Sequence, residues 1–295
     1  MESSFVAVGL PIALAVIMFG LGLSLTVADF RRVAHNPRAI AVILGCQMLL
    51  LPLVAFGLTV VFDLEPYLAV GLMILAASPG GTTSSVYSHL FRGDVALNVT
   101  LTAINSLLGL ISLPIVVNLA LNHFVGSDES VGMQPAKLLQ VFAVVLIPVI
   151  LGMVVRHRRP EFAARADKPV RIVSIVLLIG VVLGALLGEE KAMEYLARVG
   201  VVTTLFCVLS LLLGYLVPRV AGLTRGQSIA SGFEVGIHNS TLAIAVALTA
   251  LDNSEMAIAP AVYGILMFPL AALFGFAVRK LTRPREPVGA EGTRA

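Results

Sequence analysis

Residues 78–85 read SPGGTTSS and residues 232–240 read GFEVGIHNS. Both stretches are polar and carry glycine, yet each interrupts an apolar segment long enough to cross a membrane, one in each half of the chain. Because hydrocarbon satisfies no free backbone N–H or C=O group, broken helices at membrane depth must face protein or a wet cavity. Paired interruptions in corresponding positions of two halves are typical of the binding site of a secondary transporter. Glu234 strengthens this prediction, since intramembrane carboxylates mark functional sites.

The composition is that of an integral membrane protein, with 58% hydrophobic and 13% charged residues in 295. Apolar segments of membrane length are too numerous for one buried core. We count nine, at about residues 5–27, 38–61, 66–89, 95–121, 136–155, 170–188, 198–217, 227–250 and 256–278. The sequence therefore predicts an all-α membrane protein of nine transmembrane helices over residues 1–281, followed by a disordered cytoplasmic tail over 282–295.

The net charge of +3 could suggest a nucleic-acid partner, but the placement of the charges explains it better. If the N-terminus lies outside, all but three of the 20 Lys and Arg residues fall on the inner connections, the exceptions being Lys137, Lys191 and Arg198. Positive charge is retained inside. We therefore expect a multi-pass protein of the plasma membrane, in a bacterium the inner membrane, with a cytoplasmic C-terminus, the bilayer as its surroundings and no nucleic-acid partner.

Oxygen-bearing side chains follow the first interruption. Proline and two glycines at 79–81 break the third segment, and the half-helix that resumes presents free N–H groups and a positive dipole end, which suit an anion. Asn98 and Thr102 are four residues apart and share one helical face. Any one of these polar residues could simply bond a neighbouring helix. Taken together they favour a cation site, because hard cations prefer clustered oxygens; its candidates are Ser84, Ser85, Asn98 and Thr102.

The second interruption supplies a carboxylate. Gly236 is expected to break the helix and free the carbonyls of Val235 and Ile237 as oxygen donors. An unpaired buried charge is costly, and the centres of the nine segments contain no Lys or Arg that could pair with Glu234. A metal ion or a proton is then its partner, although a protonated Glu kept only for packing would also fit. Gln47 in the second segment is either a further ligand or a bond between helices.

Residues 17–251 resemble the bile acid:sodium symporter family of sodium-coupled organic-anion carriers. The resemblance lies in IMFGLGLSLTVADF (17–30), SPGGTTSSVYSHLFRGDVALNVTLT (78–102) and FEVGIHNS (233–240), in family order and spacing. It implies an inverted-repeat, alternating-access transporter with nine rather than ten helices. A panel would comprise about 5–27, 136–155 and 170–188. A core of about 38–121 and 198–278 would contain the two crossing broken helices.

The resemblance also implies which residues bind sodium. One ion would be held by Ser84, Ser85, Asn98, Thr102 and Glu234. A second would be held by Gln47, Glu234, the carbonyls of Val235 and Ile237, and His238. Position 238 is Gln in better-known members, and an imidazole nitrogen is a poor substitute for an oxygen ligand. We expect the second site to be weakened or pH-sensitive, unless water or a hydroxyl completes it.

The expected substrate is a small organic anion, such as a keto or hydroxy acid, bound near Thr82, Thr83 and Asn239. The alternative within transporters is a proton-coupled organic-anion carrier or an exporter of the arsenite-permease kind, although the latter should carry a Cys near Ser78. An intramembrane zinc hydrolase using Glu234 and His238 would need a third ligand and an unbroken helix, which Gly236 opposes. A non-transporting anion sensor also remains open. We expect no enzymatic activity, and the sequence gives no indication of oligomeric state.

Overall fold

The structure, a computed structural model, describes residues 15–16, 18–20, 22–23, 36–126, 135–166, 169 and 192–280. Regular structure within these residues is helical apart from one isolated antiparallel bridge. The helices of the first half are α3 (Pro37–Gly45), a π-helical turn (Cys46–Leu50), α4 (Leu51–Val61), α5 (Pro66–Ala77), α6 (Ser84–Leu90) and α7 (Val95–Phe124). Those that follow are α8 (Pro135–Arg158), α10 (Ala192–Val220), α11 (Arg225–Gly236), α12 (Ser240–Ala245), a π-helical turn (Val246–Ala250) and α13 (Glu255–Lys280).

Four helical stretches among the described residues are long and apolar enough to cross a membrane: Pro37–Val61, Val95–Phe124, Val199–Val220 and Glu255–Lys280. They match the predicted second, fourth, seventh and ninth segments, and α8 contains the fifth. These helices confirm a multi-pass, all-helical membrane protein. Most of the first segment, the sixth segment (170–188) and the tail (282–295) lie outside the described residues, so the count of nine stays a prediction.

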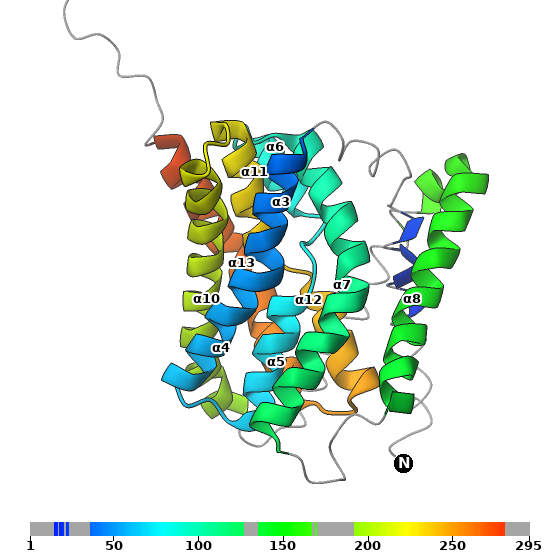
Figure 1. Cartoon of the computed structure of the whole chain (residues 1–295), viewed down its shortest axis with the longest axis vertical. Coiled ribbons are helices and arrows are strands. Elements are labelled where there is room, and N and C mark those ends of the chain that lie inside the picture. Colours follow the sequence, from blue (N-terminus) through cyan, green and yellow to red (C-terminus); the bar gives the residue numbers. More distant parts are fainter. Residues whose placement is uncertain are drawn as a thin grey trace, which may run out of the picture.

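The third and eighth segments are each broken into two half-helices, as the sequence predicts. α5 ends where Ser78 leaves helical geometry ahead of Pro79, and α6 resumes at Ser84. α11 ends at Gly236 because Ile237 adopts an extended conformation, and Asn239 caps the start of α12 through the Leu242 N–H. The two halves of each pair point to opposite ends of the bundle, with α5 and α12 in its lower part and α6 and α11 in its upper part (Figure 1).

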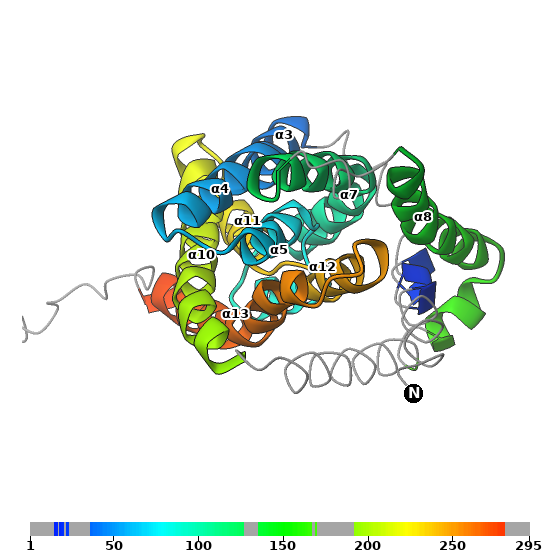
Figure 2. The same cartoon turned by 90° about the horizontal axis from the view of Figure 1, so that it is seen from below.

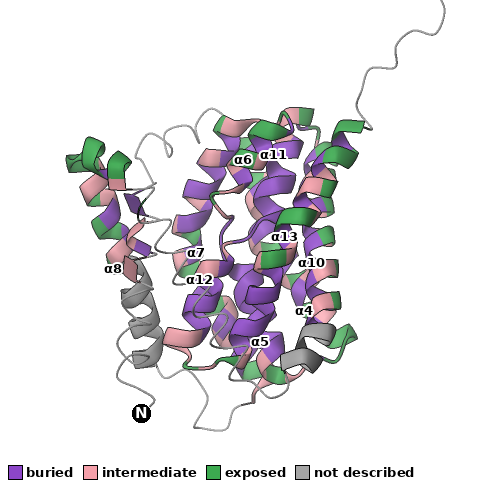
Figure 3. Cartoon of the chain, turned by 180° about the vertical axis from the view of Figure 1, so that it is seen from behind, coloured by how far each residue is buried: buried purple, intermediate pink, exposed green. Residues whose placement is uncertain are grey.

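The half-helices α5 and α11 form the interior of the bundle. Seen from below, α5 lies at the centre, with α3, α4, α7, α10 and α13 around it (Figure 2). Every residue of α5 from Leu68 to Ala77 and of α11 from Ser228 to Gly236 is buried (Figure 3). The surrounding helices instead expose large apolar side chains, as expected for surfaces that face lipid. Each polar interruption therefore begins at the buried end of a half-helix, α5 or α11.

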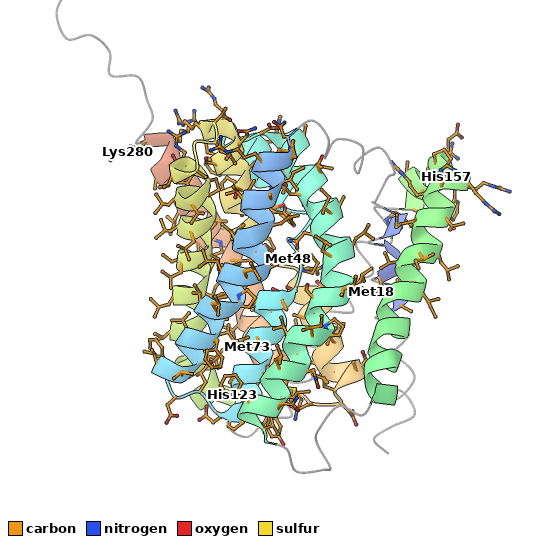
Figure 4. All side chains as sticks on the ribbon, viewed as in Figure 1. Met18, Met48, Met73, His123, His157 and Lys280 are labelled. Carbon is orange, nitrogen blue, oxygen red and sulfur yellow. The ribbon has the colours of Figure 1, made fainter. Side chains whose placement is uncertain are left out.

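Charged groups mark the two ends of the bundle. The arginine-bearing ends of α3, α8, α10, α11 and α13 lie together (Figure 1), and Lys280 and His157 occupy this end in Figure 4, whereas His123 lies at the opposite one. Among the described residues, Asp63, Glu65, Asp252 and Glu255 lie at the opposite end, although Asp94 and Glu161 lie at the arginine-bearing one. The arginines thus gather at one end of the described bundle, and the assignment of that end to the cytoplasm stays a prediction.

Two glycines bring the first segment against α8. A Cβ on Gly22 would lie 2.1 Å from the Val149 carbonyl oxygen, and one on Gly152 would lie 2.4 Å from that of Phe19. Small residues allow helix backbones to approach this closely. The first and fifth segments, two of the three predicted panel members, are thus in contact. The division into panel and core itself stays a prediction.

Candidate functional site

The two interruptions meet and pair with one another at what we call the crossing, residues 78–83 and 237–239. Gly80 and His238 form the antiparallel bridge. The Gly81 N–H donates to the Ile237 carbonyl at 2.6 Å, and the Asn239 N–H donates to the Pro79 carbonyl at 2.9 Å. Each break thus satisfies backbone groups of the other, which is how a broken helix is tolerated at membrane depth. One consequence is that the Ile237 carbonyl already accepts a hydrogen bond and keeps a single lone pair for any ligand.

Glu234 lies beside the crossing with only 1% of its surface exposed. Its Oε2 accepts hydrogen bonds from Ser84 Oγ at 2.8 Å and Thr102 Oγ1 at 2.6 Å. Its Oε1 has no hydrogen-bond partner among the described residues. The carboxylate belongs to the second half of the chain and its donors to the first, so this cluster joins the halves.

Asn98 completes the same cluster. Its Oδ1 lies 2.9 Å from Ser84 Oγ, whose single proton can be given either to Asn98 or to Glu234. Its Nδ2 donates to the Ala230 carbonyl at 2.9 Å, which fixes α7 against α11. Four of the five predicted first-site residues are thus together. Ser85 is not with them: it is half-buried and its hydroxyl donates to the Thr82 carbonyl at 2.8 Å.

Gly80 makes room for the carboxylate. A Cβ at this position would lie 2.1 Å from Glu234 Oε1, 2.4 Å from Cδ and 2.8 Å from Oε2. Non-bonded carbon atoms normally pack at about 3.5–4.0 Å. The side chain of Glu234 therefore occupies the space that any other residue at position 80 would fill, and its Oε1 faces the backbone of the first break.

Gln47 and His238 form a second buried group on the other side of the crossing. Gln47 lies in the π-helical turn Cys46–Leu50, and its Nε2 donates to the Ser78 carbonyl at 3.1 Å and lies 3.4 Å from His238 Nδ1. Gln47 Oε1 and His238 Nε2 have no hydrogen-bond partner among the described residues. The sequence predicted both as ligands of a second ion, and the structure places them in contact.

The His238 ring is held by aromatic neighbours. It stacks on Phe206 with centroids 5.5 Å apart and an interplanar angle of 19°, and it meets the edge of Tyr263 at 5.4 Å. The Tyr263 hydroxyl donates to the Gly236 carbonyl at 2.8 Å, and so satisfies the end of α11. The sequence analysis missed Tyr263, because a tyrosine in an apolar segment gives no signal of this role.

Asn105 is a second residue that the sequence analysis missed. It is buried on α7, three residues after Thr102 and seven after Asn98, and its Nδ2 has no hydrogen-bond partner among the described residues. Continuing the spacing of Asn98 and Thr102 by one step would have found it, since positions i, i+4 and i+7 share a helical face.

The predicted substrate residues lie at the edges of the crossing. Thr82 is exposed, whereas Thr83 and Asn239 are half-buried and directly precede α6 and α12. Asn239 Oδ1 is already used as the cap of α12, at 3.0 Å from the Leu242 nitrogen. Val235 is buried in the last turn of α11, next to Glu234.

The donor atoms of the site suit a hard cation of low charge. Hydroxyl, amide and carboxylate oxygens dominate, and such ligands suit group I and II ions rather than transition metals. Within the described part of the chain, no three His, Cys, Asp or Glu residues come together as a transition-metal site would require. The zinc alternative therefore has no ligand set there.

Comparisons with known proteins agree with this chemistry. The model of the Sodium Bile acid symporter family matches residues 11–195. The human ileal sodium/bile acid cotransporter is 30% identical over 282 residues, which cover 91% of this chain and 78% of that protein. An uncharacterized sodium-dependent transporter of Bacillus subtilis (strain 168) is 30% identical over 256 residues, 86% of this chain and 78% of the relative. A probable chloroplastic sodium/metabolite cotransporter of Oryza sativa subsp. japonica is 30% identical over 281 residues, 93% of this chain and 64% of the relative.

Proposed function

The chain belongs to the sodium bile acid symporter family, and from this premise we propose that it is a sodium-coupled symporter that imports a small organic anion by alternating access. The observation that carries the proposal is the buried Glu234 carboxylate, which has two hydroxyl donors on one oxygen and none on the other. A carboxylate without a cationic partner at this depth is costly. Sodium, as a co-transported substrate, would offset that cost when it is bound.

The surrounding groups fit a sodium ion. Ser84 and Thr102 each keep lone pairs on the oxygen that donates to Glu234, and Asn98 Oδ1 lies 2.9 Å from Ser84. We assign the first ion to this group together with Glu234, with Ser85 as a predicted further ligand. We assign a second, weaker site to Gln47, Glu234, His238 and the Val235 and Ile237 carbonyls, since Gln47 Oε1 lacks a partner in the described structure.

Coupling follows from where the ligands originate. Glu234 is contributed by the second half of the chain, and Ser84 and Thr102 by the first. An ion bound among them would hold the two broken helices together, so its presence can bias which conformation the carrier adopts. The anion would bind at the edge of the crossing near Thr82, Thr83 and Asn239, in a fold of nine helices divided into panel and core.

The number of ions determines how strongly the carrier can concentrate its substrate. A tenfold sodium gradient supplies about 1.4 kcal/mol per ion, and a potential of about 100 mV adds roughly 2.3 kcal/mol per net charge. Two ions with one monovalent anion would therefore yield about 5 kcal/mol, or accumulation of several thousandfold. One ion would yield only about tenfold. The accumulation ratio in proteoliposomes would measure the stoichiometry.

The distribution of charge supports an orientation with the C-terminus in the cytoplasm. The arginine-bearing helix ends lie together at one end of the bundle (Figure 1), and the positive-inside rule assigns that end to the cytoplasm. We propose the plasma membrane, in a bacterium the inner membrane, as the location.

The decisive experiment replaces Glu234. We expect NaCl to raise the melting temperature of the detergent-purified protein above its value in KCl of equal ionic strength, because a ligand that binds only the native state stabilises it. Glu234→Gln should abolish this difference, whereas Glu161→Gln, the same change at an exposed position, should retain it. A panel of small keto and hydroxy acids would then be screened in NaCl. A full sodium response in Glu234→Gln would refute the proposed site, and a wild-type response to pH but not to sodium would favour the proton-coupled alternative.

A further inference from the structure

A hydrogen-bond donor and a hydrogen-bond acceptor, both buried near the crossing, have no partner among the described residues. Asn105 is buried, with 3% of its surface exposed, and its Nδ2 donates no hydrogen bond. Glu234 Oε1 accepts none. Buried polar groups are nearly always paired, so each unpaired group calls for an explanation. One is a neutral donor and the other the free oxygen of a carboxylate.

The register of α7 places Asn105 on the helical face that lines the Glu234 cluster. Thr102 contacts Oε2 at 2.6 Å, and a Cβ on Gly109 would lie 3.4 Å from Pro79 Cδ. Asn105 lies between them on the same helical face, three residues after Thr102 and four before Gly109. Glu234 Oε1 faces Gly80, the residue next to Pro79. Asn105 and the unpaired oxygen therefore lie at the same level of the bundle, on helices that the Thr102 and Asn98 hydrogen bonds hold together.

We propose that Asn105 is the partner of Glu234 in the ion-free carrier: its Nδ2 donates to Oε1 when no cation is bound, and a cation displaces it. This inference rests on the proposed sodium coupling of the same site. A neutral amide suits this role because it stabilises the bare carboxylate without binding it as tightly as Lys or Arg would. Rotation of the amide about its terminal torsion, which has a broad energy minimum, is enough to make and break the contact.

The sign of the expected mutational effect distinguishes this role from the alternatives. If Asn105 competes with sodium for Glu234, its removal should tighten sodium binding. If Asn105 were instead an ion ligand, its removal should weaken binding. A purely structural residue would lower the melting temperature equally in NaCl and KCl and leave the sodium midpoint unchanged.

The test is a sodium titration of thermal stability at constant ionic strength, at pH 8 to limit competition by protons. Asn105→Leu removes both amide groups at similar volume, and we expect its half-stabilising sodium concentration to fall about tenfold, the size of one net hydrogen bond to a charged group. Ser106→Ala is the matched control, because the Ser106 hydroxyl is also buried on α7 but bonds only its own helix, at the Thr102 carbonyl. Its midpoint should match the wild type.

Each result is decisive. An unchanged or higher sodium midpoint in Asn105→Leu overturns the inference while leaving the proposed coupling intact. Absence of any sodium response in the wild type overturns the coupling and the inference with it. If Asn105→Leu does not fold, Asn105→Ala provides the same comparison, since it also lacks the donor and adds no bulk.

Discussion

Replacing Gly80 with alanine tests whether Glu234 must sit against the backbone of the first break. The added Cβ would lie 2.1 Å from Oε1 and 2.4 Å from Cδ of Glu234. To restore ordinary contact the carboxylate must move by about 1 Å or more. It currently accepts from Ser84 at 2.8 Å and from Thr102 at 2.6 Å, and such a movement would break or severely weaken both bonds.

The size of the effect follows from those two bonds. A hydrogen bond to a charged group contributes about 1.5–3 kcal/mol, so loss of both removes at least about 3 kcal/mol from the geometry that assembles the ion site. If sodium binding needs that geometry, its half-stabilising concentration should rise a hundredfold or more, at about 1.4 kcal/mol per factor of ten. The melting temperature in KCl should also fall, because the displaced carboxylate stays buried.

The assay is the same sodium titration of thermal stability. Gly57→Ala is the control: it is an exposed glycine within α4, and a Cβ there would meet no atom within 4 Å. Its sodium midpoint should equal the wild-type value, and its melting temperature in KCl should be equal or slightly higher, because alanine favours the helix by up to about 1 kcal/mol. A Gly80→Ala protein whose sodium midpoint stays within twofold of the wild type would refute the argument.

Two further substitutions test the second buried group. His238→Gln replaces the imidazole, whose Nδ1 lies 3.4 Å from Gln47 Nε2, with a side chain that offers an amide oxygen. The Hill coefficient for sodium-dependent stabilisation should rise from about one towards two, because oxygen is the better ligand for a hard cation. An unchanged coefficient would show that His238 does not limit the second site. Tyr263→Phe removes the hydroxyl that donates to the Gly236 carbonyl. The protein should lose about 1–3 kcal/mol of stability, seen as a lower melting temperature in NaCl and in KCl alike. An unchanged melting temperature would mean that another group satisfies the carbonyl.

Much of the polar cluster around Glu234 could be predicted from the sequence because its signals are local. Spacing by four places Asn98 and Thr102 on one face of a helix, and an acidic residue in an apolar segment singles out Glu234. Ser85 shows the limit of counting oxygens without regard to direction. Adjacent residues on a helix point about 100° apart, and the Ser85 hydroxyl donates to the Thr82 carbonyl whereas that of Ser84 donates to Glu234; the role of Ser85 as a ligand stays a prediction.

No local sequence pattern could predict that the two breaks form hydrogen bonds with each other. Gly81 bonds Ile237 across more than half of the chain, and Tyr263 completes the end of α11 from another helix. The sequence indicated that Gly236 frees carbonyl groups, but the partners of those carbonyls are set by tertiary structure. The sequence predicted Gly80 only as a helix breaker. The structure adds a steric reason for glycine at this position, because the carboxylate of Glu234 occupies the space that a Cβ would need.

The bonds at the crossing limit how the carrier can move. Separating the breaks would leave the Gly81 and Asn239 N–H groups and their carbonyl acceptors unpaired at membrane depth, at a cost of several kcal/mol. The crossing and the four half-helices around it should therefore move as one body through the transport cycle. If the carrier works by alternating access as proposed, the boundary that slides lies elsewhere. The contact of α7 with α8, which also packs closely against the first segment at Gly22 and Gly152, is the strongest candidate. A disulfide across the crossing should preserve transport, whereas one that joins α7 to α8 should stop it.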